Sequence, residues 1–282
     1  MTRRLSEHIV MAAFAVAFVL APLATVIPTA ASDTGGFHWA RKSSQFTLPV
    51  GSNLNGPWPS ILNQAVTDWN GSNTVTFRIV TGGTNAQECR PVTGRVEVCN
   101  AQYGTRMGWL GLTRLYFNKQ GDHIDAATVQ MNDSFFDTGG LYDNNAARQH
   151  TMCHELGHTT GLDHVKTSSC MNDSQSAVFN NLHPINDDFN TLARIYSHDD
   201  STSTVAGSEK KDKKHKKKKK KKKSHKKNAN RNSKSASPQS VGTVSPPALP
   251  SISSGVDASE TMTIESTEDG RKVVTFITWA EE

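Results

Sequence analysis

One stretch of the sequence, Cys153–His164 (CHELGHTTGLDH), constrains the fold more than any other. It contains three histidines, a glutamate and a conformationally free glycine at fixed spacing. On an α-helix, residues four apart lie on one face, so His154 and His158 point the same way. Gly161 readily takes the left-handed conformation, which ends the helix and lets His164 return toward the other two histidines. The spacing therefore predicts a helix, a chain reversal and a cluster of imidazoles.

This pattern fits a catalytic zinc site better than a chance cluster of histidines. Three neutral imidazoles leave one tetrahedral position open for water, which is what a catalytic zinc requires. Glu155 lies beside the first histidine, where it can reach a zinc-bound water without being a ligand. We expect zinc to lower the pKa of that water, and Glu155 to pass its proton to the leaving amine. The predicted ligands are His154, His158 and His164, and the predicted general base is Glu155.

The segment HELGHTTGLDH (154–164) resembles the extended zinc motif HExxHxxGxxH of the metzincin metallopeptidases. Ser169-Cys170-Met171-Asn172 resembles the turn that these enzymes place beneath the zinc, with Met171 as its methionine. The resemblance covers residues 40–200 and is nearest to matrixin-like and other small bacterial secreted members. It implies an α+β zincin domain, in which a twisted, mostly parallel sheet carries two long helices and a C-terminal helix.

The same resemblance implies a secreted endopeptidase that binds its protein or peptide substrate extended along an edge strand. We expect residues 124–132 (IDAATVQMN) to form that strand, and the chain to be a monomer. Two other functions stay open. One is an amidase acting on cell-wall peptide. The other is a polyanion-binding adhesion protein whose zinc site is structural or inactive.

An even number of cysteines in a chain with an export signal suggests two disulfides. The cysteines are Cys89, Cys99, Cys153 and Cys170, and their number leaves three pairings open. We favour Cys89–Cys99, because it would close a local hairpin around Thr93-Gly94. Cys153–Cys170 follows from the metzincin resemblance, since that bridge would pin the methionine turn to the zinc helix. The alternative is that Cys153 is a thiolate ligand of the metal.

Apolar periodicity predicts the elements around the motif. Apolar residues recur at steps of three and four from Trp58 to Trp69, which indicates a helix. The same pattern predicts a last helix over residues 185–196, and the zinc helix begins near Asn145. Segments rich in β-branched and aromatic residues predict strands over 45–50, 74–80, 112–118 and 124–132.

Both ends of the chain differ in composition from the predicted peptidase domain, residues 32–200. Residues 1–31 begin with an arginine pair, continue as an apolar run and end in small residues. This order predicts a cleaved signal peptide, with an N-terminal membrane anchor as the alternative. Residues 201–255 are rich in lysine, serine and proline and are predicted to be a disordered linker. Residues 256–282 predict a short β-hairpin, which must dock on the domain or stay loose.

The formal net charge of +5 hides a strong segregation of charge. Residues 210–234 contain 16 of the 31 Lys and Arg and one of the 26 Asp and Glu, so the rest of the chain has a net charge of −10. The lysine run at 210–227 would attract polyanions through counterion release. Two roles for the lysine run therefore stay open: tethering to an anionic cell surface, and a solvated tail without a specific partner.

Several aspartates and histidines outside the motif are further candidates for metal ligands. A calcium site is the alternative for the aspartates, but they lack EF-hand spacing, which favours loop solvation and helix capping. These aspartates are Asp122, Asp125, Asp133, Asp137 and Asp143. His150 is expected to be a packed or surface residue, and His123 and His183 have no spacing that indicates a metal.

Overall fold

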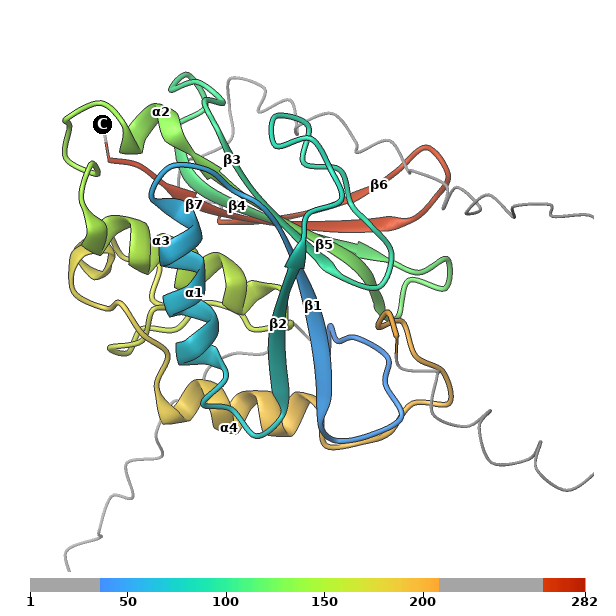
Figure 1. Cartoon of the computed structure of the whole chain (residues 1–282). Helices are drawn as coiled ribbons and strands as arrows, with labels where there is room; N and C mark the ends of the chain where they lie inside the picture. Colours follow the sequence, from blue (N-terminus) through green and yellow to red (C-terminus); the bar gives the residue numbers. More distant parts are fainter. Residues whose placement is uncertain (1–35, 208–260, 282) are drawn as a thin grey trace, which may run out of the picture.

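The structure is a computed structural model that describes residues 36–207 and 261–281. Its secondary structure places it in the α+β class (Figure 1). The strands are β1 (Phe46–Asn53), β2 (Val75–Thr81), β3 (Val96–Ala101), β4 (Trp109–Phe117), β5 (Ile124–Asn132), β6 (Met262–Ser266) and β7 (Lys272–Trp279). The helices are α1 (Trp58–Trp69), α2 (Asp133–Phe136), α3 (Asn145–His158), the 3-10 helix η1 (Gln175–Phe179) and α4 (Asn186–Ile195).

The described strands form one mixed sheet in the order β2-β1-β3-β5-β4-β7-β6. The part from β2 to β5 is parallel, because β1 pairs in parallel with β2 and β3, and β3 pairs in parallel with β5. Strands β4, β7 and β6 are added to it by antiparallel pairings. Strand β5 therefore lies inside the sheet with a partner on each side. The expectation that residues 124–132 form the substrate-binding edge is wrong.

Helices α1 and α3 pack against each other and against the sheet to form the main core (Figure 1). The apolar positions of α1 that recur at steps of three and four are all buried, as expected for an amphipathic helix. They are Trp58, Ile61, Leu62, Ala65, Val66 and Trp69. Helix α3 differs, because every residue from Ala147 to His158 is buried. The histidines of the sequence motif therefore lie inside the domain.

The segment between Cys89 and Cys99 corrects the sequence-based expectation of a local hairpin. The two cysteines form a disulfide, but only Val96–Ala101 is a strand, and it pairs with β1 and β5 rather than with residues 89–92. Gly94 is instead bonded to other parts of the domain, with its amide donating to the Asp125 carbonyl at 2.7 Å. The turn at Thr93-Gly94 is present, with the Arg95 amide donating to the Val92 carbonyl at 3.3 Å, but the strand that follows it pairs with distant strands.

Strands β6 and β7 form the hairpin that the last segment of the sequence predicted. The hairpin does not stand alone, because β7 pairs with β4 along its length, from Tyr116↔Val273 to Trp109↔Trp279. A lone hairpin is only marginally stable in water, and joining a larger sheet removes that difficulty. The C-terminal residues thus become part of the sheet on the side of β4 (Figure 1).

Several predictions concern residues outside the described ranges. The signal peptide (1–31) and the lysine run (210–227) both fall there, as does nearly all of the predicted linker. Among the residues that the structure describes, no helix has the length and apolar character needed to cross a bilayer.

Candidate metal centre

Helix α3 is held firmly at both ends. At its start, the Asn144 side chain accepts a hydrogen bond from the Ala147 amide at 2.9 Å, which satisfies one of the free helix N–H groups. At its end, Gly161 has a φ of +90°, and a Cβ there would lie 1.9 Å from the Phe37 carbonyl oxygen. A side chain at this position would be both strained and blocked. The chain can therefore reverse here and bring His164 back to the helix.

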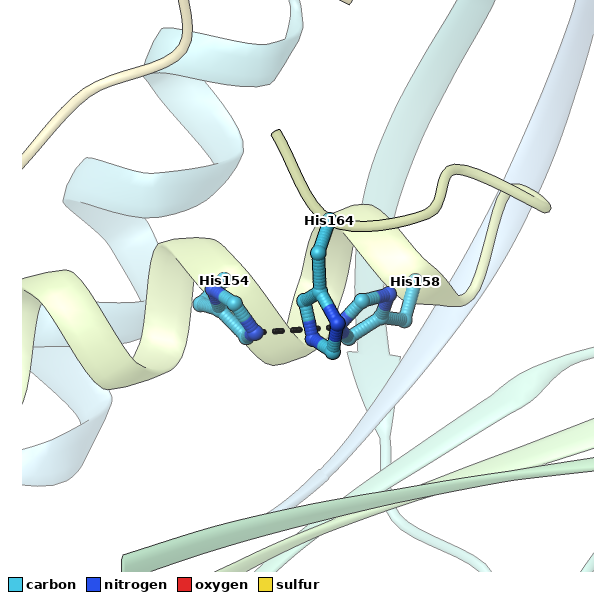
Figure 2. A group of neighbouring side chains, drawn as sticks. All are labelled: His154, His158 and His164. Carbon is cyan, nitrogen blue, oxygen red and sulfur yellow. Dashed lines mark hydrogen bonds between the residues drawn. The ribbon is translucent and has the colours of Figure 1, made fainter. Parts of the chain in front are cut away.

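The three histidines predicted as ligands lie together, as Figure 2 shows. One ring nitrogen from each of His154, His158 and His164 lies within 4.8 Å of the others. The Nε2 atoms of His154 and His158 are 2.9 Å apart. The two helix positions and the residue after the reversal thus form a single donor cluster.

The hydrogen bonds around these rings fix which nitrogen faces the cluster. His154 Nδ1 lies 2.7 Å from the Cys170 carbonyl, and His158 Nδ1 lies 2.8 Å from the Leu162 carbonyl. A carbonyl oxygen can only accept, so each Nδ1 carries the proton and each neutral ring keeps a lone pair on Nε2. Two lone pairs then face each other at 2.9 Å, an arrangement that a metal ion bound to both nitrogens, or a proton on one of them, would satisfy. In metal-binding imidazoles, a carbonyl that accepts from the N–H facing away from the metal orients the ring and raises its basicity.

The third histidine supplies a further free donor. His164 Nδ1 lies 3.2 Å from the Thr261 hydroxyl, and its Nε2 is buried without a hydrogen-bond partner. A buried polar atom without a partner is costly, and a metal ion would satisfy it. Three imidazole nitrogens with oriented rings are the donor set of a zinc site with one open position. The residues present therefore fit zinc.

Burial keeps the three candidate ligand histidines neutral at ordinary pH. Desolvation is the main cause that lowers the pKa of His154 and His158 well below its ordinary value, and neighbouring histidines lower it further. The pKa of His164 is also lowered, chiefly by burial. Because only the neutral ring offers a lone pair to a metal, this shift favours metal binding.

Glu155 is completely buried, and hydroxyl groups from two strands hold its carboxylate. Thr113 on β4 donates to Oε2 and Thr278 on β7 donates to Oε1, both at 2.6 Å. Burial raises the pKa of Glu155 to about 7, although both hydrogen bonds act to lower it. A carboxyl group with a pKa near neutrality is well matched to accepting and returning a proton.

The methionine turn lies directly against the helix. A Cβ at Gly157 would lie 2.3 Å from Met171 Sδ, so this position in α3 admits no side chain while Met171 is in place. The Cys153–Cys170 disulfide ties the turn to the helix, which is the pairing favoured from the sequence. The Cys170 carbonyl in turn orients His154, so the bridge holds a candidate ligand in place. Because both sulfurs are bonded to each other, the alternative of a Cys153 thiolate ligand does not hold.

Sequence reasoning missed several residues that contact the histidines or Glu155. They include Thr113, Thr261, Phe276 and Thr278, and the Phe276 ring stacks on His158 with ring centroids 4.1 Å apart. Strand alternation places Phe276 and Thr278 on one face of β7. It gives no indication that this face lies against α3, because the contact depends on where the hairpin docks.

The remaining candidates have other roles. Calcium has no support, since Arg148 pairs with Asp137 and Asp143, and Asp133 accepts from Trp58 and Asn100. His150 is packed inside the domain with Nδ1 2.6 Å from the Asn181 carbonyl, and burial lowers its pKa to about 4. His183 is exposed and pairs with Asp68 at 2.7 Å.

No protein-family model matches the chain, and no curated protein matches it. Among solved structures, myroilysin is similar at 16% identity and a TM-score of 0.35, covering 57% of this chain and 97% of that chain. An archaemetzincin from Methanopyrus kandleri has 14% identity and a TM-score of 0.37, covering 55% and 98%. High choriolytic enzyme 1, a hatching enzyme zinc-protease from Oryzias latipes, has 11% identity and a TM-score of 0.32, covering 57% and 94%. Similarity this distant does not establish a family.

Proposed function

We propose that the chain is a zinc-dependent endopeptidase. The observation that carries the proposal is the pair of imidazole Nε2 atoms 2.9 Å apart, whose rings both donate Nδ1–H to carbonyl groups. His164 adds a third buried nitrogen, and Glu155 adds a carboxyl group whose pKa is close to neutrality. Three donors with an adjacent base are suited to the activation of water rather than to a closed structural site.

In this proposal His154, His158 and His164 hold the metal. Bound zinc would lower the pKa of a water molecule and polarise the carbonyl of the scissile bond. Glu155 would accept a proton from the attacking water on one carboxylate oxygen and return it to the leaving nitrogen. The Thr113 hydroxyl, which donates to the other oxygen, holds the carboxylate in position. The Cys170 and Leu162 carbonyls keep the ligand rings in the tautomer that exposes Nε2.

The N-terminal sequence and the disulfides support a proposal for the location of the enzyme. The N-terminal residues have the composition of a signal peptide, and two disulfides suit an oxidising compartment. We therefore propose secretion, with the lysine run binding an anionic polymer at the cell surface. Binding of the full chain to heparin beads or teichoic acid that is lost at high salt, and lost when residues 210–227 are deleted, would support this part.

The endopeptidase proposal is tested with the zinc-loaded chain on a quenched fluorescent peptide library. We expect slow hydrolysis that stops on chelation, returns with zinc and is lost in Glu155→Gln. Zinc content, measured by mass spectrometry of the metal, should be the same in parent and variant. Equal hydrolysis by Glu155→Gln would contradict the assigned role of this residue. Mass analysis of products from peptidoglycan would separate a cell-wall amidase from a general endopeptidase.

A further inference from the structure

The outer edge of β4 is occupied by the chain's own C-terminal strand. β7 runs antiparallel to β4, with Gly111↔Thr278, Leu112↔Ile277 and Thr113↔Phe276 as directly paired residues. An exposed sheet edge binds extended peptides through main-chain hydrogen bonds, and alternate side chains of the peptide then give specificity. β7 therefore sits where an extended peptide would pair with the strand that carries Thr113.

The side chains of β7 that face α3 contact the proposed catalytic groups. Phe276 stacks on the His158 ring with an interplanar angle of 10°. Thr278, two residues further along the same face, donates its hydroxyl to Glu155 Oε1. Thr261, just before β6, lies 3.2 Å from His164 Nδ1. The hairpin thus touches two of the three ligands and the base.

These contacts close the site. His154, Glu155 and His158 have 0% exposure, and Phe276 is equally buried. Both carboxylate oxygens of Glu155 already accept hydrogen bonds, one of them from the hairpin. A peptide bond cannot approach a base and two proposed ligands that have no accessible surface, and the side chain of the third, His164, is only 10% exposed. The conformation described here is therefore one in which substrate is excluded.

The hairpin is held along its whole length. At one end, the Lys272 ammonium lies 3.9 Å from the centroid of the Phe117 ring, a favourable cation–π distance. At the other end, the Trp279 carbonyl accepts from Gln175 at 2.8 Å, and the Glu281 amide donates to the Tyr142 hydroxyl at 2.6 Å. Tyr142 precedes α3 and Gln175 follows it, so segments from both sides of α3 hold the C-terminal end of the strand.

We propose that residues 261–281 are an intramolecular inhibitor that occupies the peptide-binding edge of β4. This inference rests on the proposed peptidase function and adds a substrate class to it. The substrates are extended, β-forming peptides with a large apolar side chain where Phe276 lies. The hairpin is joined to the domain through residues 208–260, so a cut there leaves it held by non-covalent contacts alone. That connection includes the lysine run, which offers many bonds to a protease that cleaves after lysine.

The test weakens β7 in the full chain with Phe276→Ala/Thr278→Val. The matched control is Thr263→Val/Ile264→Ala on β6, where Ile264 is exposed and the Thr263 hydroxyl is buried without a hydrogen-bond partner. Hydrolysis of the peptide library is measured for zinc-loaded parent, variant and control. We expect kcat/KM to rise about tenfold or more in the variant, since a weaker docked state is more often open, and to stay unchanged in the control.

A second measurement does not depend on catalysis. A fluorescein-labelled peptide of residues 272–279 (KVVTFITW) is titrated into Glu155→Gln chains and followed by anisotropy. We expect saturable binding to the chain that also carries Phe276→Ala/Thr278→Val, and at least about tenfold weaker binding to the chain with an intact hairpin. Circular dichroism and a cooperative thermal transition confirm that both chains are folded.

The outcomes distinguish failure of the inhibitor proposal from failure of the peptidase proposal. Equal hydrolysis and equal peptide binding in parent and variant would overturn the inhibitor and leave the peptidase function standing. Stronger peptide binding by the variant, with no hydrolysis by any zinc-loaded chain, would support the occluded edge and overturn the peptidase function.

A different observation carries a second inference. His38, His198 and Asp200 form another cluster whose ligand atoms all lie within 4.8 Å of one another. The His38 and His198 Nε2 atoms are 3.2 Å apart, and they lie 3.5 and 3.6 Å from Asp200 Oδ1. Zinc–nitrogen bonds of about 2.0–2.1 Å in a tetrahedron separate neighbouring ligand atoms by about 3.3 Å. The three measured separations are close to that value.

Partners behind these ligands orient them. His38 Nδ1 lies 2.6 Å from the Gly36 carbonyl, which leaves the lone pair of the neutral ring on Nε2. Asp200 Oδ2 accepts from the Arg41 amide at 3.0 Å, which leaves Oδ1 facing the histidines. His123 contacts the carboxylate from the side, with its Nε2 3.2 Å from the same Oδ1 and its Nδ1 2.8 Å from Asp122.

We infer that this cluster is a structural zinc site that fastens the first described segment to the chain after α4. The zinc content of gel-filtered protein tests it. We expect two zinc ions per parent chain, one in His38→Ala/His198→Ala, one in His154→Ala/His158→Ala, and two in the control His183→Ala. A simple ion-pair network of protonated histidines with Asp200 would leave the content of His38→Ala/His198→Ala equal to that of the parent, and that result would overturn the site.

Discussion

Helix α3 and strand β7 both reach Glu155, but they are attached to the domain in different ways. α3 carries the disulfide to Cys170, and its Cys153 carbonyl accepts from the Trp69 indole at 2.9 Å. β7 has no covalent tie to the site, and the pairing with β4 and side-chain contacts such as Phe276 on His158 hold it. Of the two elements that enclose Glu155, α3 is held by a covalent bond and β7 by non-covalent contacts alone.

Because β7 is held by non-covalent contacts alone, it could leave the enclosed site and admit a substrate. Changes in α3 should damage the proposed metal centre itself, because two of its three proposed ligands, His154 and His158, and the proposed base Glu155 belong to that helix. Changes in β7 should leave the ligand set intact and alter access and the environment of Glu155. The predictions below separate these two kinds of effect.

The largest expected effect lies on the helix side. Replacing Glu155 with Gln keeps the shape of the side chain but removes the proton acceptor. A general base contributes about 10²–10⁴-fold to the rate. We therefore expect a loss of that size in kcat/KM, measured in the Phe276→Ala/Thr278→Val background, where access is improved. Zinc content should not change. A loss below about tenfold would show that another group accepts the proton.

The disulfides give the next largest effect. Cys153→Ser/Cys170→Ser opens a bridge across 17 residues and should lower the free energy of unfolding by about 3 kcal/mol. It should also weaken zinc binding, because the Cys170 carbonyl orients His154. Cys89→Ser/Cys99→Ser is the matched control, with a separation of 10 residues and no contact to the ligands. Urea unfolding and competitive chelator titration measure both quantities. Equal zinc affinity in the two variants would contradict the bracing role of Cys170.

The pH dependence of the zinc-free chain reports the enclosure of Glu155. Burial raises its pKa from 4.5 to about 7, so between these values the native chain holds a proton that the unfolded chain has lost. Its contribution to stability is complete below about pH 4.5 and disappears as the pH rises through about 7. From about pH 4.5 to about pH 8, the parent should lose about 3 kcal/mol more than Glu155→Gln. Urea unfolding with chelator present measures this, and parallel pH profiles for the two chains would refute it.

The smallest expected effect lies on the strand side. Thr278→Val removes one hydroxyl donor to Glu155 and should cost about 1 kcal/mol of the free energy of unfolding. The same substitution at Thr263 is the control, because that hydroxyl is buried without a hydrogen-bond partner and its loss should cost nothing. Thermal unfolding of both variants checks the difference. A cost at Thr263 equal to that at Thr278 would mean that the Glu155 contact contributes nothing.

Many of the helices and strands could be predicted because local residue patterns determine where they form. The steps of three and four from Trp58 to Trp69 match α1, and β-branched segments match β2 and β5. The Cys89–Cys99 segment was misread as a hairpin because composition reports a turn but not the partner of the strand that follows. The edge strand was misplaced for the same reason, since strand order in a sheet is decided by contacts between distant segments.

The sequence by itself determined the chemistry of α3. Helical spacing places His154 and His158 on one face, and the conformational freedom of Gly161 allows His164 to join them. Only the tertiary structure decided what covers that chemistry. Phe276 and Thr278 lie more than a hundred positions from α3, and their alternation fixes a face of β7 without fixing its partner. Docking on β4 is a long-range pairing, so no local pattern could reveal that the chain closes its own site.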